Sequence, residues 1–284
     1  MERIEIPVGP FTFDALAEGP DDGELVVLLH GFPQTSSSWR SQLAALAEAG
    51  YRAVAPDQRG YSPRARPRDV ADYGLDHLVA DVEAMVDWLG GHRFHLVGHD
   101  WGAAVSWKLA GQSPERLRTL TVLSVPHPKA FAAALSGELG GDQAERSSYM
   151  ALFAAEGTAE LMVADDAALL RGVFVGSGLS EEAARPYVEA LANVEALRAA
   201  LNWYRAAASG AGLTGDLPSI TTPTMFVWST EDVALGREGA EATADHVDGP
   251  YRFEILEGVS HWIADQAPDK LNALLLEHLA THRD

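Results

Sequence analysis

The sequence predicts an α/β protein whose mostly parallel, doubly wound sheet is interrupted by a helical insertion. Short apolar runs alternate with segments of helical periodicity over residues 1–126, and the alternation returns over residues 216–284. Between about residues 127 and 215, strand-like runs vanish and alanine-rich helical patterns replace them. Because repeated strand–helix units with buried strands form parallel sheets, we expect a core in two parts, 1–126 and 216–284, and a helical cap at 127–215.

The first part of the core begins with a predicted hairpin at the edge of the sheet. Arg3–Val8 and Phe11–Ala17 alternate apolar and polar residues, and Gly9-Pro10 separates them. Leu25–Leu29 is apolar throughout, which is typical of a central strand buried on both faces. The other elements expected here are a helix over Ser36–Ala49, a strand over Tyr51–Ala55, a helix over Asp76–Leu89, a strand over Phe94–Val97, a helix over Ala103–Gly111 and a strand over Leu120–Val125.

The predicted cap contains three segments with helical patterns, and strands return after it. The helical segments are Ser147–Ala155, Ala159–Leu170 and Glu181–Ala208. The second part of the core is expected to hold strands over Thr224–Ser229 and Tyr251–Leu256, followed by a helix over Asp269–His282.

The composition excludes several classes of partner. The chain has 41 acidic and 21 basic residues and a formal net charge of −20, which argues against binding to nucleic acid or to anionic membranes. It contains no cysteine, so disulfides and thiolate metal sites are excluded, as fits a reducing cytoplasm. The start of the chain lacks the long apolar stretch of a signal peptide, and no apolar run approaches the roughly 18 residues of a membrane span. We therefore expect a cytoplasmic protein.

An aspartate occupies the turn in the segment Gly98-His99-Asp100-Trp101-Gly102, between a predicted strand and a predicted helix. The glycines of such a G-x-D-x-G turn let a strand bend sharply into a helix and hold the middle residue at the edge of the sheet. A serine there would cleave esters or amides. A carboxylate instead displaces a leaving group from an sp³ carbon and forms an ester that must then be hydrolysed. Asp100 therefore predicts a substrate such as an epoxide or an alkyl halide.

An acid and a histidine follow later in the chain, each after a predicted strand, in the order that such a nucleophile requires. Asp232 is the expected orienting acid, with Glu231 as its competitor, and His261 is the expected base. Since the carboxyl ends of parallel strands meet at one sheet edge, we expect these side chains to lie near Asp100. Two backbone amides, those of Phe32 and Trp101, are the candidate oxyanion donors. Among the other histidines, His30 and His99 are expected to shape loops, and His127 is a candidate pocket residue.

The motifs resemble those of the epoxide hydrolase branch of the α/β-hydrolase fold. The matching segments are HGFPQTSSSW at 30–39, PDQRGYS at 56–62, GHDWGA at 98–103, EDVALG at 231–236 and GVSHWIADQAP at 258–268. In that family two tyrosines of the helical cap bind the epoxide oxygen. The segments Ser148–Phe153 and Leu201–Arg205 resemble those two tyrosine motifs, so the resemblance implies that Tyr149 and Tyr204 do this.

The chemistry of ring opening makes the same demand. The oxygen of an opened epoxide becomes an alkoxide whose conjugate acid is about as weak an acid as water. A phenol with a pKa of about 10 can hydrogen-bond to that oxygen and donate a proton as charge develops. A halide needs only N–H donors, and Trp101 could supply one, but Phe32 has no side-chain donor. The residues therefore favour a small apolar epoxide over a halide.

Two other functions stay open at this point. A haloalkane or haloacid dehalogenase would use the same aspartate nucleophile, and a catalytically weak ligand-binding module could keep the fold. We expect no cofactor and no metal. The sequence leaves both a monomer and a homodimer open.

Overall fold

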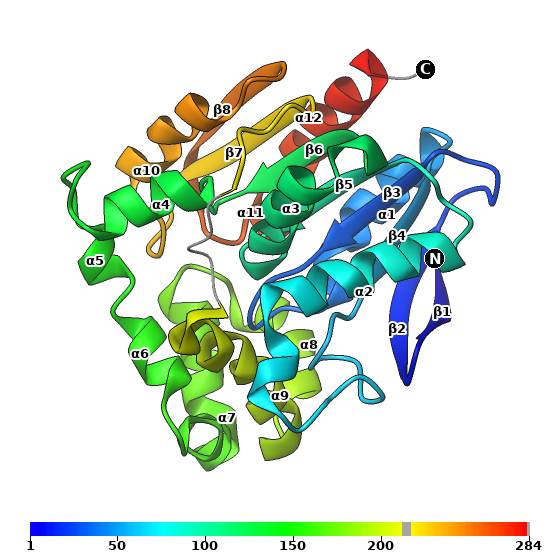
Figure 1. Ribbon diagram of the computed structural model, residues 1–284. Coiled ribbons are helices and arrows are strands. Elements are labelled where there is room, and N and C mark those ends of the chain that lie inside the picture. The colour runs from blue at the N-terminus through cyan, green and yellow to red at the C-terminus, as the bar shows by residue number, and fades with distance from the viewer. Residues whose placement is uncertain (212–216, 283–284) are drawn as a thin grey trace.

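The computed structural model describes residues 1–211 and 217–282, and within them the chain forms an eight-stranded sheet (Figure 1). The strand order across the sheet is β1-β2-β4-β3-β5-β6-β7-β8. The strands are β1 (Glu2–Val8), β2 (Phe11–Glu18), β3 (Leu25–Leu29), β4 (Arg52–Pro56), β5 (Phe94–His99), β6 (Leu117–Leu123), β7 (Thr224–Glu231) and β8 (Tyr251–Ser260).

The sheet is antiparallel only at one edge. β1 pairs with β2 as a hairpin and β2 pairs antiparallel with β4, whereas every pairing from β4 to β8 is parallel. The predicted edge hairpin and mostly parallel sheet are therefore confirmed. Because β3, β5, β7 and β8 run in one direction, the loops after them gather at one edge of the sheet.

Helices cover both faces of the sheet. In β3, Val26 and Leu28 belong to the apolar core under α1 and α12, whereas Val27 and Leu29 belong to the core under α2 and α3. This alternation follows from the period-2 geometry of a strand. The helices of the core are α1 (Arg40–Glu48), α2 (Leu75–Trp88), α3 (Trp101–Gln112), α10 (Arg237–Ala242), α11 (Ile263–Gln266) and α12 (Pro268–Thr281), with shorter helical turns η1 (Ser36–Trp39), η2 (Val70–Tyr73), η3 (Pro114–Arg116) and η5 (Thr243–His246).

The described residues between β6 and β7 form helices joined by loops, with an isolated β-bridge from Ile220 to Val247. In Figure 1, α6 to α9 lie together below the sheet, apart from the helices that cover its faces. We call α4 to α9 the helical insertion. Its members are α4 (Pro128–Leu135), α5 (Gln143–Arg146), α6 (Tyr149–Ala154), α7 (Thr158–Gly176), α8 (Glu181–Leu191) and α9 (Val194–Ala206), followed by the turn η4 (Ala207–Ala211).

Three helix predictions need correction. The segment predicted as one helix from residue 181 to 208 is two helices, because the Asn193 side chain accepts a hydrogen bond from the Ala196 amide (2.8 Å) and starts α9. Helix α7 is kinked where Asp165, Asp166 and Ala167 take positive φ angles. The expected helix from residue 36 begins as a 3₁₀ turn capped by the Thr35 hydroxyl.

Two buried polar contacts fasten the helical insertion to the core. The Trp203 indole in α9 donates to the Arg59 carbonyl (2.8 Å), and the Arg59 guanidinium forms a bidentate pair with Asp81 (2.7 Å for both bonds). The Tyr187 hydroxyl in α8 donates to Asp265 in α11 (2.7 Å). Burial raises the pKa of that carboxyl to about 6. Because Trp203 is fixed in this way, the orientation of the next residue in α9 is fixed as well.

Within the part of the chain that is described, none of the helices combines the length and the apolar character needed to cross a membrane.

Candidate active site

Asp100 lies at the sharp turn between β5 and α3, with φ 53° and ψ −119°. The turn requires glycine at both positions of the motif, because other backbone lies too close to leave room for a Cβ atom. A Cβ on Gly98 would come within 2.4 Å of the Gly102 carbonyl, and one on Gly102 would come within 2.2 Å of the Leu29 carbonyl. The strain at a positive-φ aspartate is therefore supported by tight packing, as is typical of a functional turn.

Backbone amides surround the Asp100 carboxylate. The Phe32 N–H donates to Oδ1 (2.8 Å), and the Trp101 amide also stabilises the charged form. Burial alone would raise the pKa of Asp100, but the hydrogen bond and charge of His261 and the Trp101 amide together hold it below its usual value. Asp100 is therefore ionised at neutral pH, with one oxygen in an amide pocket and the other facing His261.

His261 connects the two carboxylates. Its Nδ1 donates to Oδ2 of Asp232 (2.8 Å), and its Nε2 lies 3.6 Å from Oδ2 of Asp100. The other Asp232 oxygen accepts from the Ala234 and Leu235 amides at 2.8 and 3.0 Å, so the loop after β7 fixes that carboxylate. The structure thus places Asp232 against the imidazole, whereas the side chain of its neighbour Glu231 is exposed.

The charges around His261 set its protonation. Burial disfavours the imidazolium, but Asp232 and Asp100 outweigh burial and raise the pKa of His261 to about 10. Burial also opposes the charged form of Asp232, yet the imidazolium and two backbone amides hold its pKa below the usual value. In the resting site an imidazolium therefore lies between two carboxylates.

The other histidines named from the motifs lie outside this arrangement. His99 Nε2 donates to the His261 carbonyl (2.9 Å), and burial lowers the pKa of His99 to about 4, so it stays neutral. His30 Nε2 accepts from the Gln58 amide (3.2 Å). His127 is buried at the start of α4, where its Nδ1 accepts from the Lys129 amide, and it lines neither cavity at Asp100. The expectation that His127 reaches the pocket is therefore wrong.

The two tyrosines come from different helices and converge above Asp100. Tyr149 starts α6 and Tyr204 lies near the end of α9, with 6.4 Å between their ring centroids. Tyr204 packs edge-on against Phe32 and Trp101 at centroid distances of 5.3 and 5.1 Å. Burial and the nearby Asp100 charge raise the pKa of both phenols far above 10, so both remain protonated.

Two adjoining cavities at Asp100, which we call the large and the small lobe, share Asp100, Tyr149, Tyr204 and Ala234 in their walls. The large lobe has a volume of about 180 Å³ and the small lobe about 30 Å³. The large lobe is also lined by Phe32, Phe153, Val173, Ser177, Val233, His261 and Trp262. The small lobe is also lined by Trp101, Ala104, Val125, Phe131, Ser147, Met150 and Leu235.

Several residues that line the large lobe were not predicted from the sequence. Phe153 lies four residues after Tyr149, so helical spacing could have placed both on one face of α6. Val173 and Ser177 reach the large lobe from the end of α7 and carry no signal of that role in their motifs. Among the described residues, no group of three His, Asp or Glu side chains is arranged to hold a metal ion.

The sequence of this chain matches a known protein family and several known proteins. A family model described as the α/β hydrolase fold matches residues 24–268. The AB hydrolase superfamily protein YfhM of Bacillus subtilis is 35% identical over 275 residues, with 94% of each chain covered. Epoxide hydrolase 4 of Mus musculus is 34% identical over 293 residues, with 99% of this chain and 80% of the mouse protein covered.

Solved structures give the same result. The crystal structure of epoxide hydrolase A from Mycobacterium thermoresistibile matches with a TM-score of 0.85 and 29% identity, covering 98% of each chain. The predicted fold and the resemblance noted from the motifs are both confirmed. The chain belongs to the α/β hydrolase fold family and, within it, to the epoxide hydrolases.

Proposed function

We propose that the protein hydrolyses an epoxide to a vicinal diol through a covalent ester on Asp100. The observation that carries the proposal is that one cavity exposes an ionised carboxylate, two protonated phenols and a histidine to the same small space. In this proposal α6 and α9 act as part of a cap, because they hold the phenols opposite the carboxylate.

The first step opens the ring. Oδ2 of Asp100 attacks one ring carbon, a C–O bond forms to that carbon, and the bond from that carbon to the ring oxygen breaks. Tyr149 and Tyr204 hydrogen-bond to the ring oxygen, and a phenolic proton passes to it as the alkoxide develops. The product is a hydroxyalkyl ester of Asp100.

The second step hydrolyses the ester. The imidazolium proton of His261 first passes to the phenolate that ring opening leaves, because loss of the Asp100 charge weakens the hold of His261 on that proton. Neutral His261 then takes a proton from a water molecule that attacks the Asp100 carbonyl carbon, and Asp232 orients and stabilises the resulting imidazolium. The oxygen that already accepts from the Phe32 amide becomes the oxyanion of the tetrahedral intermediate. Collapse of that intermediate breaks the bond between the carbonyl carbon and the substrate oxygen, the hydroxyl proton that came with the water passes to the leaving oxygen, and the diol and the carboxylate are formed.

Single-turnover hydrolysis in ¹⁸O-labelled water tests the proposal. With enzyme in excess over styrene oxide, the water oxygen is expected in the Asp100 carboxylate, detected by mass spectrometry of the peptide, and the first diol released is expected to be unlabelled. Direct attack of water on the ring would instead put the label in the diol and leave the peptide unlabelled, which would contradict the ester intermediate.

The tyrosines separate ring opening from halide displacement. Tyr149→Phe and Tyr204→Phe are each expected to lower kcat/KM for an epoxide by about 10²-fold, because each removes one donor to the ring oxygen. Tyr187→Phe is a matched control, since Tyr187 is also buried but contacts Asp265 outside the cavity. Halide release from a short haloalkane that is equally fast in the unchanged protein and in both active-site variants would favour a dehalogenase.

The rate of ring opening is expected to be almost independent of pH between about 5.5 and 9. Asp100 has a lowered pKa and is ionised throughout this range, whereas both phenols have raised pKa values and stay protonated. Stopped-flow tryptophan fluorescence under single-turnover conditions, to which Trp101 and Trp262 beside the site contribute, measures the rate of this step. A fall in the rate of ring opening above pH 7 would contradict this expectation. It would mean that a proton needed for ring opening is lost at a pH far below the raised pKa values of the two phenols.

A further inference from the structure

We propose that the protein acts on epoxides in which one ring carbon carries an apolar substituent of about the size of a phenyl ring and the other carries at most a methyl group. This inference rests on the proposed function, because it names the epoxides that the site admits. It is carried by the unequal size of the two lobes that meet at Asp100.

The position of the epoxide ring follows from the residues that both lobes share. The ring carbon under attack must face Asp100, and the ring oxygen must face Tyr149 and Tyr204. These three side chains line both lobes, so the ring lies where the lobes meet. Groups attached to the two ring carbons then extend in different directions, one into each lobe.

The volumes decide which groups fit. An engineered apolar cavity of about 150 Å³ binds benzene, and a water molecule occupies about 30 Å³ of liquid. The large lobe, at about 180 Å³, therefore accommodates a phenyl ring or a chain of similar volume. The small lobe, at about 30 Å³, accommodates a group of about the size of water or methyl and has no room for a ring. The second ring carbon must accordingly carry only hydrogen atoms or a methyl group.

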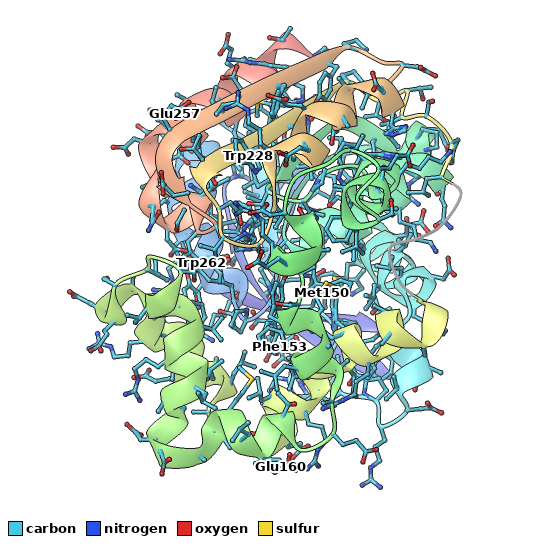
Figure 2. All side chains as sticks on the ribbon, turned by 90° about the vertical axis from the view of Figure 1, so that its left-hand side faces the viewer. Met150, Phe153, Glu160, Trp228, Glu257 and Trp262 are labelled. Atoms are coloured by element: carbon cyan, nitrogen blue, oxygen red, sulfur yellow. The ribbon has the colours of Figure 1, made fainter. Side chains whose placement is uncertain are left out.

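The walls of the small lobe resist widening. Phe131 from α4 and Leu235 from the loop after β7 are 6% and 4% exposed, and Trp101 is 6% exposed. Close-packed side chains of this kind move little without cost. Met150 from α6 also lines this lobe and is half-buried. Figure 2 labels Met150, which lines the small lobe, and Trp262, which lines the large lobe, at separate places.

The large lobe selects an apolar substituent. Its wall carries the hydroxyl of Ser177, but that hydroxyl donates to the Val173 carbonyl (2.5 Å) and accepts from the Trp262 indole (2.9 Å). Beyond the catalytic groups, Phe153, Val173 and Trp262 present apolar surface. A charged or strongly polar substituent would lose its hydration there without a new partner.

The test compares kcat/KM for styrene oxide and trans-stilbene oxide with the purified full chain. Styrene oxide places one phenyl ring in the large lobe, whereas trans-stilbene oxide also requires room for a second ring. We expect at least about a 100-fold preference for styrene oxide, since misfit of even one methylene costs about 10- to 200-fold.

Two substitutions widen the small lobe. Phe131→Ala and Met150→Ala are each expected to raise the rate on trans-stilbene oxide relative to styrene oxide by about tenfold. Val173→Ala is the matched control, because it enlarges the large lobe and should not raise that ratio. Met150 is only half-buried, so its variant keeps the test informative if Phe131→Ala fails to fold.

The outcomes separate this inference from the proposed function. Rates on the two substrates within tenfold of each other would overturn the size limit and leave epoxide hydrolysis intact. A large preference that neither widening variant reduces would overturn the assignment of the limit to the small lobe. Failure to hydrolyse any terminal or disubstituted epoxide would overturn the proposed function itself.

Discussion

Asp100→Ala is expected to lower kcat/KM for styrene oxide by at least about 10⁴-fold, the scale seen when a catalytic nucleophile is removed. Alanine cannot form the ester, and no other carboxylate takes its place, because Asp232 Oδ2 is engaged by His261 and its Oδ1 by two amides. The tyrosines would still bind the ring oxygen, so substrate affinity should fall much less than turnover. Diol formation measured by chromatography, together with intact-protein mass, checks both points.

A carboxylate beside the site provides the control for this variant. Glu231→Ala removes an exposed acid next to Asp232, and it should retain most of the activity. Thermal unfolding of both variants would show whether the fold persists. Activity of Asp100→Ala above about 1% of the unchanged protein would exclude Asp100 as the essential nucleophile.

His261→Gln is expected to convert the enzyme into a stoichiometric trap. Ring opening needs Asp100 and the phenols, so the first step should still occur, whereas ester hydrolysis loses its base and should slow by about 10⁴-fold or more. Each protein molecule should consume one epoxide and gain the mass of one substrate. Intact-protein mass spectrometry after mixing with excess styrene oxide measures the adduct directly.

The double variant Asp100→Ala/His261→Gln is the matched control for the trap, and it should gain no mass. Adduct formation in the double variant would place the ester on another residue. Continued turnover by His261→Gln would show that a different group activates the hydrolytic water.

Local motifs and the expected parallel sheet together made Asp100, Asp232 and His261 predictable from the sequence. Each follows a strand, and parallel strands end at the same edge, so the topology alone predicts that they meet. The choice between Asp232 and Glu231 depended on which side chain turns inward. The Ala234 and Leu235 amides hold Asp232 inward, a detail of loop conformation that spacing does not reveal.

The helical insertion was less predictable for a physical reason. Resemblance pointed to Tyr149 and Tyr204, but their convergence depends on how α6 packs against α9 and how Trp203 is fixed to Arg59. Side chains from α4, α6 and α7 then determine the two lobe volumes. Such packing joins segments far apart in the chain, and helical periodicity gives only the buried face of each helix, not its neighbour.

In the proposed cycle, the imidazolium between two carboxylates determines which group supplies each proton. In the resting site Asp100, Asp232 and His261 together carry one excess negative charge. Forming the ester removes the Asp100 charge, so His261 faces one carboxylate and holds its proton less tightly. The opened ring consumes one proton through a phenol, and the imidazolium proton can restore that phenol. The resting site thus holds the proton that resets the phenol after ring opening, and giving up that proton makes His261 the base for ester hydrolysis.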